Sequence, residues 1–126
     1  MIDTLSFEEA LFLHAAAIAA FGGTSGLRDR GLLESALAQP LATLGGQSVY
    51  KSRWEAVASL GRSLIQNHPF VDGNKRVGFA AMVILLRRSG HQVICSPTDA
   101  EQMVLAIASG RMDRESIAQW LESHSV

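Results

Sequence analysis

Nine consecutive residues, from His68 to Arg76, carry most of the side chains in this sequence that could do chemistry. Gly73 and Asn74 tolerate unusual backbone angles, and they stand where a helix is expected to begin. The first amides of a helix have no partner within it and the helix dipole is positive there, so this spot favours an anion. Lys75 and Arg76 add two positive charges beside it. The stretch therefore predicts a site for a phosphate chain.

Two further residues of this stretch indicate what happens to the phosphate. Asp72 is a carboxylate beside the expected anion, which is unfavourable unless a cation lies between them, so Mg²⁺ bridging Asp72 and phosphate oxygens is implied. His68 is the side chain here that can take a proton from a hydroxyl near neutral pH. The residue types together indicate transfer of a phosphate group to a hydroxyl.

A purely structural explanation of the same residues stays open at this point. The glycine and asparagine fit an ordinary helix-start turn, the histidine a capping cation on the preceding helix, and the Lys-Arg pair a solvated surface. The charge distribution favours function. Residues 51–90 hold seven basic and two acidic residues, whereas the rest of the chain holds four and ten. A basic middle within an acidic remainder suggests a local anion site.

Helices must position this stretch, because the sequence has helical patterns almost throughout. We expect an all-α fold, a single compact domain over 1–126, with about six helices around a central buried helix. The central helix is predicted over Asn74 to Arg88, where apolar residues fall on all sides. The other helices are predicted after the caps Ser6 and Asp29, over Lys51 to Gln66, and after the caps Thr98 and Asp113, with ends at Gly22, Pro40 and Gly110.

Helical spacing also predicts where several side chains lie. One apolar stripe of the first helix is expected to face the core, made of Phe7, Leu11, His14, Ile18 and Phe21. On this stripe His14 is expected to be a core histidine with a backbone partner. The third helix carries His68 toward its inner side, and Phe70 anchors the following loop in the core.

Composition excludes several classes of protein. A chain of 126 residues with one cysteine, Cys95, makes no internal disulfide and no cysteine zinc site, which favours a reducing compartment. The acidic N-terminus is no secretory signal, and the longest apolar run, Val77 to Leu86, is about ten residues against the roughly twenty of a membrane span. A net charge of −1 disfavours direct nucleic-acid binding. We expect a cytoplasmic protein with no membrane partner.

The stretch HPFVDGNKR resembles the signature of the Fic/Doc family, His-x-Phe-x-(Asp/Glu)-(Gly/Ala)-Asn-(Gly/Lys)-Arg, with every fixed position filled. The first helix, the segment RRSGHQVICSP and the closing helices look like its death-on-curing (Doc) branch, which implies the Fic/Doc fold. By this resemblance His68 is the base toward a hydroxyl of a target protein, and Asp72 is the Mg²⁺ ligand. The nest that binds the phosphates of ATP is formed by Gly73, Asn74, Lys75 and Arg76, of which Lys75 and Arg76 also count as catalytic.

Lys75 separates two activities within the family. Members with Gly at this position typically transfer AMP from ATP to a protein hydroxyl, whereas the Lys variant is similar to Doc, which moves the γ-phosphate to a threonine of elongation factor Tu. The resemblance implies a toxin of a type II toxin-antitoxin system, a protein Ser/Thr kinase that arrests translation. Gly73 stands where the best-known Doc pattern has Ala. This makes the nest roomier and keeps AMP transfer as an alternative.

The resemblance also implies partners. Self-inhibited members carry a (Ser/Thr)-x-x-x-Glu-(Gly/Asn) segment whose Glu obstructs ATP binding, and this sequence has no such segment. Inhibition in trans is therefore expected, by a helix of a cognate antitoxin similar to Phd. Residues 41–50 are the candidate for a flap that aligns the protein substrate. An alternative of another class is a non-catalytic co-regulator that binds its antitoxin, against which the intact motif speaks.

Overall fold

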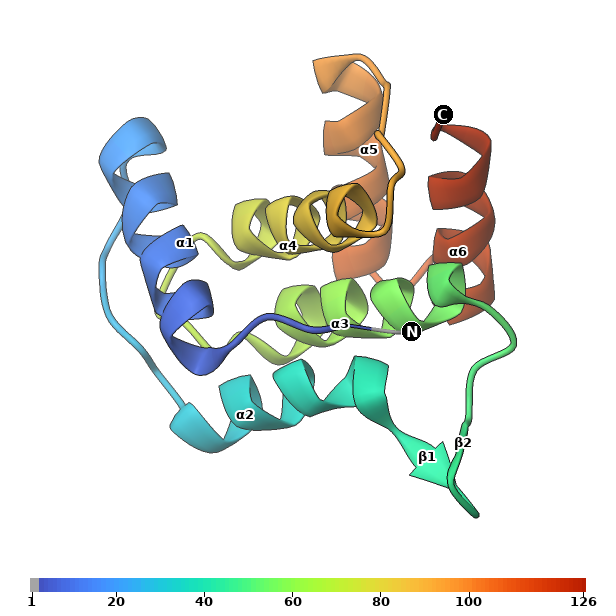
Figure 1. Ribbon diagram of the computed structural model, residues 1–126. Helices are drawn as coiled ribbons and strands as arrows, with labels where there is room; N and C mark the ends of the chain where they lie inside the picture. Colours follow the sequence, from blue (N-terminus) through green and yellow to red (C-terminus); the bar gives the residue numbers. More distant parts are fainter. Residues whose placement is uncertain (1–2) are drawn as a thin grey trace.

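The computed structural model describes residues 3–126, and over this range the chain is built almost entirely of α-helices (Figure 1). The prediction of an all-α fold of about six helices is confirmed. The elements are α1 Phe7–Phe21, α2 Arg30–Ala38, the 3₁₀ turn η1 Gln39–Leu41, β1 Thr43–Leu44, β2 Gln47–Ser48, α3 Arg53–Asn67, α4 Asn74–Arg88, α5 Pro97–Ala108 and α6 Arg114–Ser123.

Polar side chains begin three of the helices at the predicted places. The Ser6 hydroxyl accepts the Glu9 N–H at 3.0 Å, and the Glu9 carboxylate accepts the Ser6 N–H at 2.8 Å, a complete capping box. The carboxylates of Asp29 and Asp113 cap α2 and α6 by accepting the N–H groups of Leu32 and Ser116. Each cap satisfies an amide that has no partner in its helix, and a cap of this kind contributes about 1 kcal/mol.

Other helix boundaries differ from the prediction. α3 begins later than Lys51 because the Ser52 hydroxyl caps it. α5 begins after Ser96 rather than Thr98, because the Ser96 hydroxyl accepts a first-turn N–H and a proline follows, the residue favoured at the first helical position. Pro40 does not end the helical structure at once. It lies within η1, a 3₁₀ turn that directly follows α2.

α1 turns a different face to the core from the one predicted. Its buried residues are Ala10 and His14, whereas Leu11 is 37% exposed and Phe21 is 66% exposed. The predicted stripe was wrong at Leu11 and Phe21, because the inward side of α1 consists of Ala10 and His14 together with the half-buried Phe7, Leu13, Ala17 and Ile18. Phe12, next to Leu11, is 78% exposed.

Two helices, α3 and α4, make up the centre of the molecule, so the predicted central helix shares this place. α3 packs against α2, α4, α5 and α6, and α4 packs against α1, α3 and α5. Figure 1 shows α3 and α4 one above the other in the middle, with α1 across one end and α5 and α6 toward the other.

Two glycines allow α3 and α4 to approach closely. A Cβ added to Gly61 would lie 2.2 Å from Met82 Sδ, and one added to Gly78 would lie 2.5 Å from Ile65 Cγ1. The Gly78 position would also be 3.2 Å from the Gly61 carbonyl oxygen. Backbone therefore packs on backbone at this crossing, in space that any side chain would fill.

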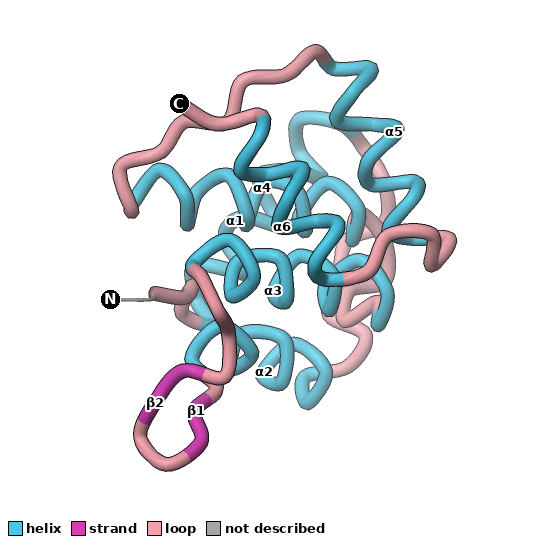
Figure 2. Tube along the Cα trace, turned by 90° about the vertical axis from the view of Figure 1, so that its right-hand side faces the viewer, coloured by secondary structure: helices cyan, strands magenta, loops and turns pink. Residues whose placement is uncertain are grey.

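The predicted loop 41–50 contains a small hairpin that projects from the helical body (Figure 2). β1 and β2 are antiparallel, with Thr43 opposite Ser48 and Leu44 opposite Gln47. Leu44 is 80% exposed. No helix within residues 3–126 has the length and apolar character that crossing a membrane requires.

We expect Gly78→Ala to lower the free energy of unfolding by about 1–3 kcal/mol, because the new methyl group meets the buried Ile65 side chain. Urea denaturation measures the change. Gly31→Ala is the matched control: it lies on the exposed side of α2, where the nearest atom is 3.4 Å from the new carbon, so the helix propensity of Ala should leave stability unchanged or up to about 1 kcal/mol higher. Equal stability of Gly78→Ala and wild type would contradict a tight crossing.

Candidate active site

The motif lies in the short connection between α3 and α4. α3 ends at Asn67, His68 follows as its C-cap, and α4 begins after Gly73. His68 has φ 51° and ψ 60°, and within residues 3–126 it is the only residue other than glycine with a positive φ. Its side chain is exposed, so the predicted position on the inner side of α3 is wrong. Because left-handed angles are unfavourable for histidine, neighbouring contacts must hold this turn.

The connection between α1 and α2, residues 22–29, packs along the motif, and we call it the clamp loop. Leu27 and Phe70 form an isolated antiparallel bridge. Beside it, the Val71 N–H donates to the Gly26 carbonyl at 3.0 Å. The clamp loop thus pairs with the motif as a strand would, through backbone groups.

Arg28 of the clamp loop holds the end of α3. Its Nε donates to the His68 carbonyl at 2.6 Å, and its Nη2 donates to the Asn67 carbonyl at 2.8 Å. The backbone N–H groups of Arg28 and Asp29 both donate to the Pro69 carbonyl, at 2.8 and 3.0 Å. The last carbonyls of a helix have no partner within it and carry partial negative charge, so a guanidinium is well suited to them. Arg28 therefore stabilises the turn at His68.

Sequence reasoning missed the clamp loop and Arg28. The available signal was three glycines, Gly22, Gly23 and Gly26, between two capped helices, and all three have positive φ. A Cβ on Gly23 would lie 2.8 Å from Asp72 Oδ2, so the glycine also makes room for the motif carboxylate. Spacing along the chain did not reveal which segment this loop pairs with.

Phe70 and Asn74 fix the motif from inside. Phe70 is 1% exposed, which confirms that it anchors the loop in the core. The Asn74 Oδ1 accepts the Phe70 N–H at 3.0 Å, and its Nδ2 donates to the Phe70 carbonyl at 3.0 Å. The Asn74 side chain is 6% exposed and 3.5 Å from His68 Nδ1. Because the side chain of Asn74 is used to close the loop, the group that Asn74 can offer to a ligand is its backbone N–H.

The start of α4 leaves a group of free amides. The first backbone bond of this helix runs from the Val77 N–H to the Gly73 carbonyl at 3.0 Å, and in the described part of the chain the N–H groups of Asn74, Lys75 and Arg76 have no acceptor. The side chains of Lys75 and Arg76 are exposed, and the Arg76 guanidinium lies 4.6 Å above the ring of Phe21. These amides and cations form what we call the amide nest.

Asp72 lies beside the amide nest with both carboxylate oxygens hydrogen-bonded. The Thr24 N–H donates to Oδ2 at 3.0 Å, and the Gly73 N–H donates to Oδ1 at 2.8 Å. These bonds, first from Thr24 and then from Gly73, hold the pKa of Asp72 below its usual value, and the charges of Lys75 and Arg76 add to the effect. The exposed side chain is therefore kept ionised.

The groups around Asp72 fit a cation that binds together with the phosphate of a ligand. Within residues 3–126, no group of three His, Cys, Asp or Glu side chains converges as a metal site. Asp72 alone offers an ionised carboxylate next to the nest, with lone pairs left on each oxygen. Mg²⁺ typically takes one or two carboxylates together with substrate phosphates, so the residues fit it.

His14 of α1 touches the motif from the other side. It is 5% exposed, and its Nε2 donates to the Asp72 carbonyl at 2.9 Å. The prediction of a core histidine with a backbone partner is confirmed.

Comparison with known proteins shows the family of this chain. The model of the Fic/DOC family matches residues 4–86. The chain belongs to the Fic/Doc family. Two relatives are similar over nearly the whole chain: a protein named "Toxin Doc" from Mycolicibacterium smegmatis, 38% identical over 120 residues (94% of this chain and 90% of the relative), and "Protein kinase doc" from Escherichia phage P1, 31% identical over 117 residues (93% and 91%).

The Fic/Doc match includes every element of the site just described. It runs from before α1 into the last turn of α4, and so contains the clamp loop, the motif and the amide nest. α5 and α6 lie beyond the matched residues and pack against α3, the helix that ends at the motif.

We expect Asp72→Asn to destabilise the Fic/Doc domain at neutral pH but not in acid. A lowered pKa means that the ionised form stabilises the fold above the usual pKa of about 3.8, and that this stabilisation is lost as the pH falls through the folded-state value. Urea denaturation of wild type and variant should therefore differ at pH 7, and the difference should shrink as the pH falls below the usual pKa and Asp72 becomes protonated. Glu122→Gln, an exposed change on α6, controls for removal of a charge. A difference that persists unchanged in acid would contradict the assignment.

Proposed function

We propose that this protein is a toxin of the Doc type that transfers the γ-phosphate of ATP to a serine or threonine hydroxyl of a target protein and so arrests translation. The observation that carries the proposal is the convergence within one short loop of an exposed imidazole, an ionised carboxylate, and free amides beside two cations. Its best-matched chemistry is phosphoryl transfer, which depends on positioning and charge stabilisation.

In the proposed reaction the amide nest binds the phosphate oxygens, and Lys75 and Arg76 stabilise the charge that develops on them. The hydroxyl oxygen of the target forms a bond to the γ-phosphorus. The bond from that phosphorus to the β–γ bridging oxygen breaks, and ADP leaves with its electron pair. His68 takes the hydroxyl proton as general base. Mg²⁺ bound through Asp72 would neutralise phosphate charge during this transfer.

The orientation of the ATP phosphate chain in the nest decides whether the γ-phosphate or AMP is transferred. A lysine at position 75 occupies space that a glycine would leave open to a diphosphate near the backbone, and we take this as the reason for placing the γ-phosphate at His68. AMP transfer is the alternative, because Gly73 has no side chain to narrow the nest. The proposed target is elongation factor Tu, in line with the resemblance of the motif to Doc, and the proposed place of action is the cytoplasm.

The relatives support a toxin and a kinase separately, since one is named as a toxin and the other as a protein kinase. The hairpin of residues 43–48 supports a protein substrate. It projects from the body, and its short strands leave backbone groups to pair with an extended segment of a target.

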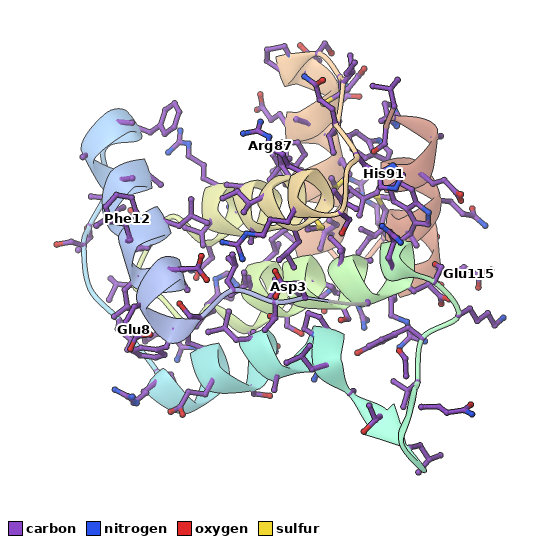
Figure 3. All side chains as sticks on the ribbon, in the orientation of Figure 1. Asp3, Glu8, Phe12, Arg87, His91 and Glu115 are labelled. Atoms are coloured by element: carbon purple, nitrogen blue, oxygen red, sulfur yellow. The ribbon has the colours of Figure 1, made fainter. Side chains whose placement is uncertain are left out.

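A toxin requires a restraint, and we propose a cognate antitoxin similar to Phd that docks a helix between α1 and α4. A groove of about 500 Å³ lies there, with an apolar floor and charged rim; its lining is Leu5, Glu8, Glu9, Phe12, Leu13, Ala16, Ile84 and Arg88. Phe12 and Glu8 project from α1 (Figure 3), and Phe12 is 78% exposed. An amphipathic helix would cover this apolar surface. The groove lies at the end of α4 opposite the motif, since its residues on α4 are Ile84 and Arg88, and it shares with the motif only the helix α1 that carries His14.

The reaction is tested with ATP labelled at either the γ- or the α-phosphate, Mg²⁺, and purified elongation factor Tu or a whole lysate. We expect γ-label alone on a protein of the mixture, and at least about a hundredfold loss with His68→Ala, because the hydroxyl loses its base. α-Label on the target would replace the kinase proposal by AMP transfer. Absence of both labels would leave the non-catalytic co-regulator.

Binding provides the control for this experiment. Arg76→Ala should weaken ATP binding in calorimetry about tenfold or more, because a charge-assisted contact to phosphate is lost. His68→Ala should bind ATP nearly as well as wild type. Unchanged binding by Arg76→Ala would contradict the phosphate assignment.

The antitoxin surface is tested by co-expression with the proposed cognate antitoxin. We expect Phe12→Asp to stay toxic but to lose protection by the partner, because a carboxylate is placed in the apolar groove. Leu105→Asp is the matched control, since Leu105 is a 44% exposed apolar residue on α5 away from the groove. Protection of the Phe12 variant equal to that of wild type would exclude this surface.

A further inference from the structure

Among residues 3–126, His14 is the one buried titratable side chain in contact with the motif that the proposed reaction does not use. It is 5% exposed, and its ring stacks on Phe70 with centroids 3.9 Å apart and planes 4° from parallel. α1 carries it to the end of α4 where the motif lies (Figure 1).

The polar contact of His14 has a defined direction. Its Nε2 lies 2.9 Å from the carbonyl oxygen of Asp72. A carbonyl oxygen has no hydrogen to give, so Nε2 must carry the proton and donate it. This buried donor is therefore satisfied by a motif peptide, rather than by a carbonyl of its own helix.

The peptide that His14 holds joins Asp72 to Gly73. In a trans peptide the C=O and the following N–H point in opposite directions. Holding the Asp72 carbonyl toward α1 therefore turns the Gly73 N–H away from α1, where it donates to Asp72 Oδ1 at 2.8 Å beside the amide nest.

A contact must hold the Asp72–Gly73 peptide in this orientation, because the backbone of Gly73 permits other orientations. Its φ of 78° lies in a region that glycine enters freely, and a glycine also tolerates the angles of the flipped peptide. A flip would turn the Asp72 carbonyl oxygen, in place of the Gly73 N–H, toward the Asp72 carboxylate beside the amide nest. The ring of His14 lies beside this peptide, since a Cβ on Gly73 would be 3.8 Å from His14 Cδ2 and Nε2, and its hydrogen bond to the Asp72 carbonyl favours the observed orientation.

We propose that His14 is a positioning residue for the phosphate site: its Nε2–H fixes the Asp72–Gly73 peptide, so that the Gly73 N–H holds the Asp72 carboxylate in place beside the amide nest. The inference rests on the proposed function only in taking phosphate to be the ligand of the nest. Its structural part, the fixed peptide, stands independently.

Two substitutions separate the donor from the packing of the ring. His14→Phe keeps an aromatic ring on Phe70 and removes the N–H. His14→Gln loses the stack but places an amide N–H at a comparable reach from the backbone. Ile117→Val, a fully buried change on α6 far along the chain, is the control for lost stability alone.

The first measurement needs no nucleotide. In amide NMR of the full chain, His14→Phe should shift the Gly73 signal and speed its solvent exchange, while His14→Gln should restore both. The second measurement is calorimetry with ATP and Mg²⁺. His14→Phe should bind about tenfold more weakly, the factor that corresponds to one hydrogen bond, and His14→Gln should bind within about threefold of wild type.

The outcomes distinguish the inference from the proposed function. If His14→Phe melts at lower temperature but keeps the Gly73 signal and ATP affinity, as Ile117→Val should, His14 only packs and the inference is wrong. If both His14 variants lose affinity equally, the donor is not the cause and the inference is also wrong. Failure of wild type to bind ATP would refute the proposed function, and the Gly73 signal would still decide whether His14 fixes the peptide.

Discussion

The close crossing of α3 and α4 is the constraint on which the rest of the structure depends. Because Gly61 and Gly78 let two backbones meet, the end of α3 and the start of α4 lie near enough for a loop of six residues to join them. Every group of the candidate site is in that loop or in the first turn beyond it. If α3 and α4 lay farther apart, the imidazole at the end of α3 and the amide nest at the start of α4 would separate.

The loop itself is held by groups that take no part in the proposed chemistry. The clamp loop pairs with it through backbone bonds, Asn74 closes it from the core side, and His14 holds one of its peptides from α1. This division leaves the side chains of His68, Lys75 and Arg76 exposed to substrate. A site made of backbone amides is especially dependent on such support, because a peptide can rotate without changing any residue's identity.

Sequence reasoning predicted what is local and missed what is distant. The caps Ser6, Asp29 and Asp113 and the start of α4 depend on residues within one turn, and they were predicted correctly. The start of α5 was wrong because Ser96 and Thr98 are both plausible caps, and only the proline between them decides. The face of α1 was wrong because this helix is apolar on several sides, so the hydrophobic pattern alone does not choose between Leu11 and its neighbour Ala10. The clamp loop could not be found, since its partner lies some forty residues away and is bound through backbone atoms.

The backbone pairing of the clamp loop has a consequence for how this protein tolerates mutation. Its contacts to the motif through Thr24, Gly26 and Asp29 use main-chain atoms, so side-chain exchanges at Thr24 would leave that contact intact. A genetic selection for variants that have lost function would therefore recover few substitutions at Thr24, although the main chain at this position holds the motif. Proline at positions 24, 28 or 29, which removes a donor, or a single inserted residue, which shifts the pairing, would reveal its importance. In related sequences the residue type should vary at position 24, whereas the length of the segment should not.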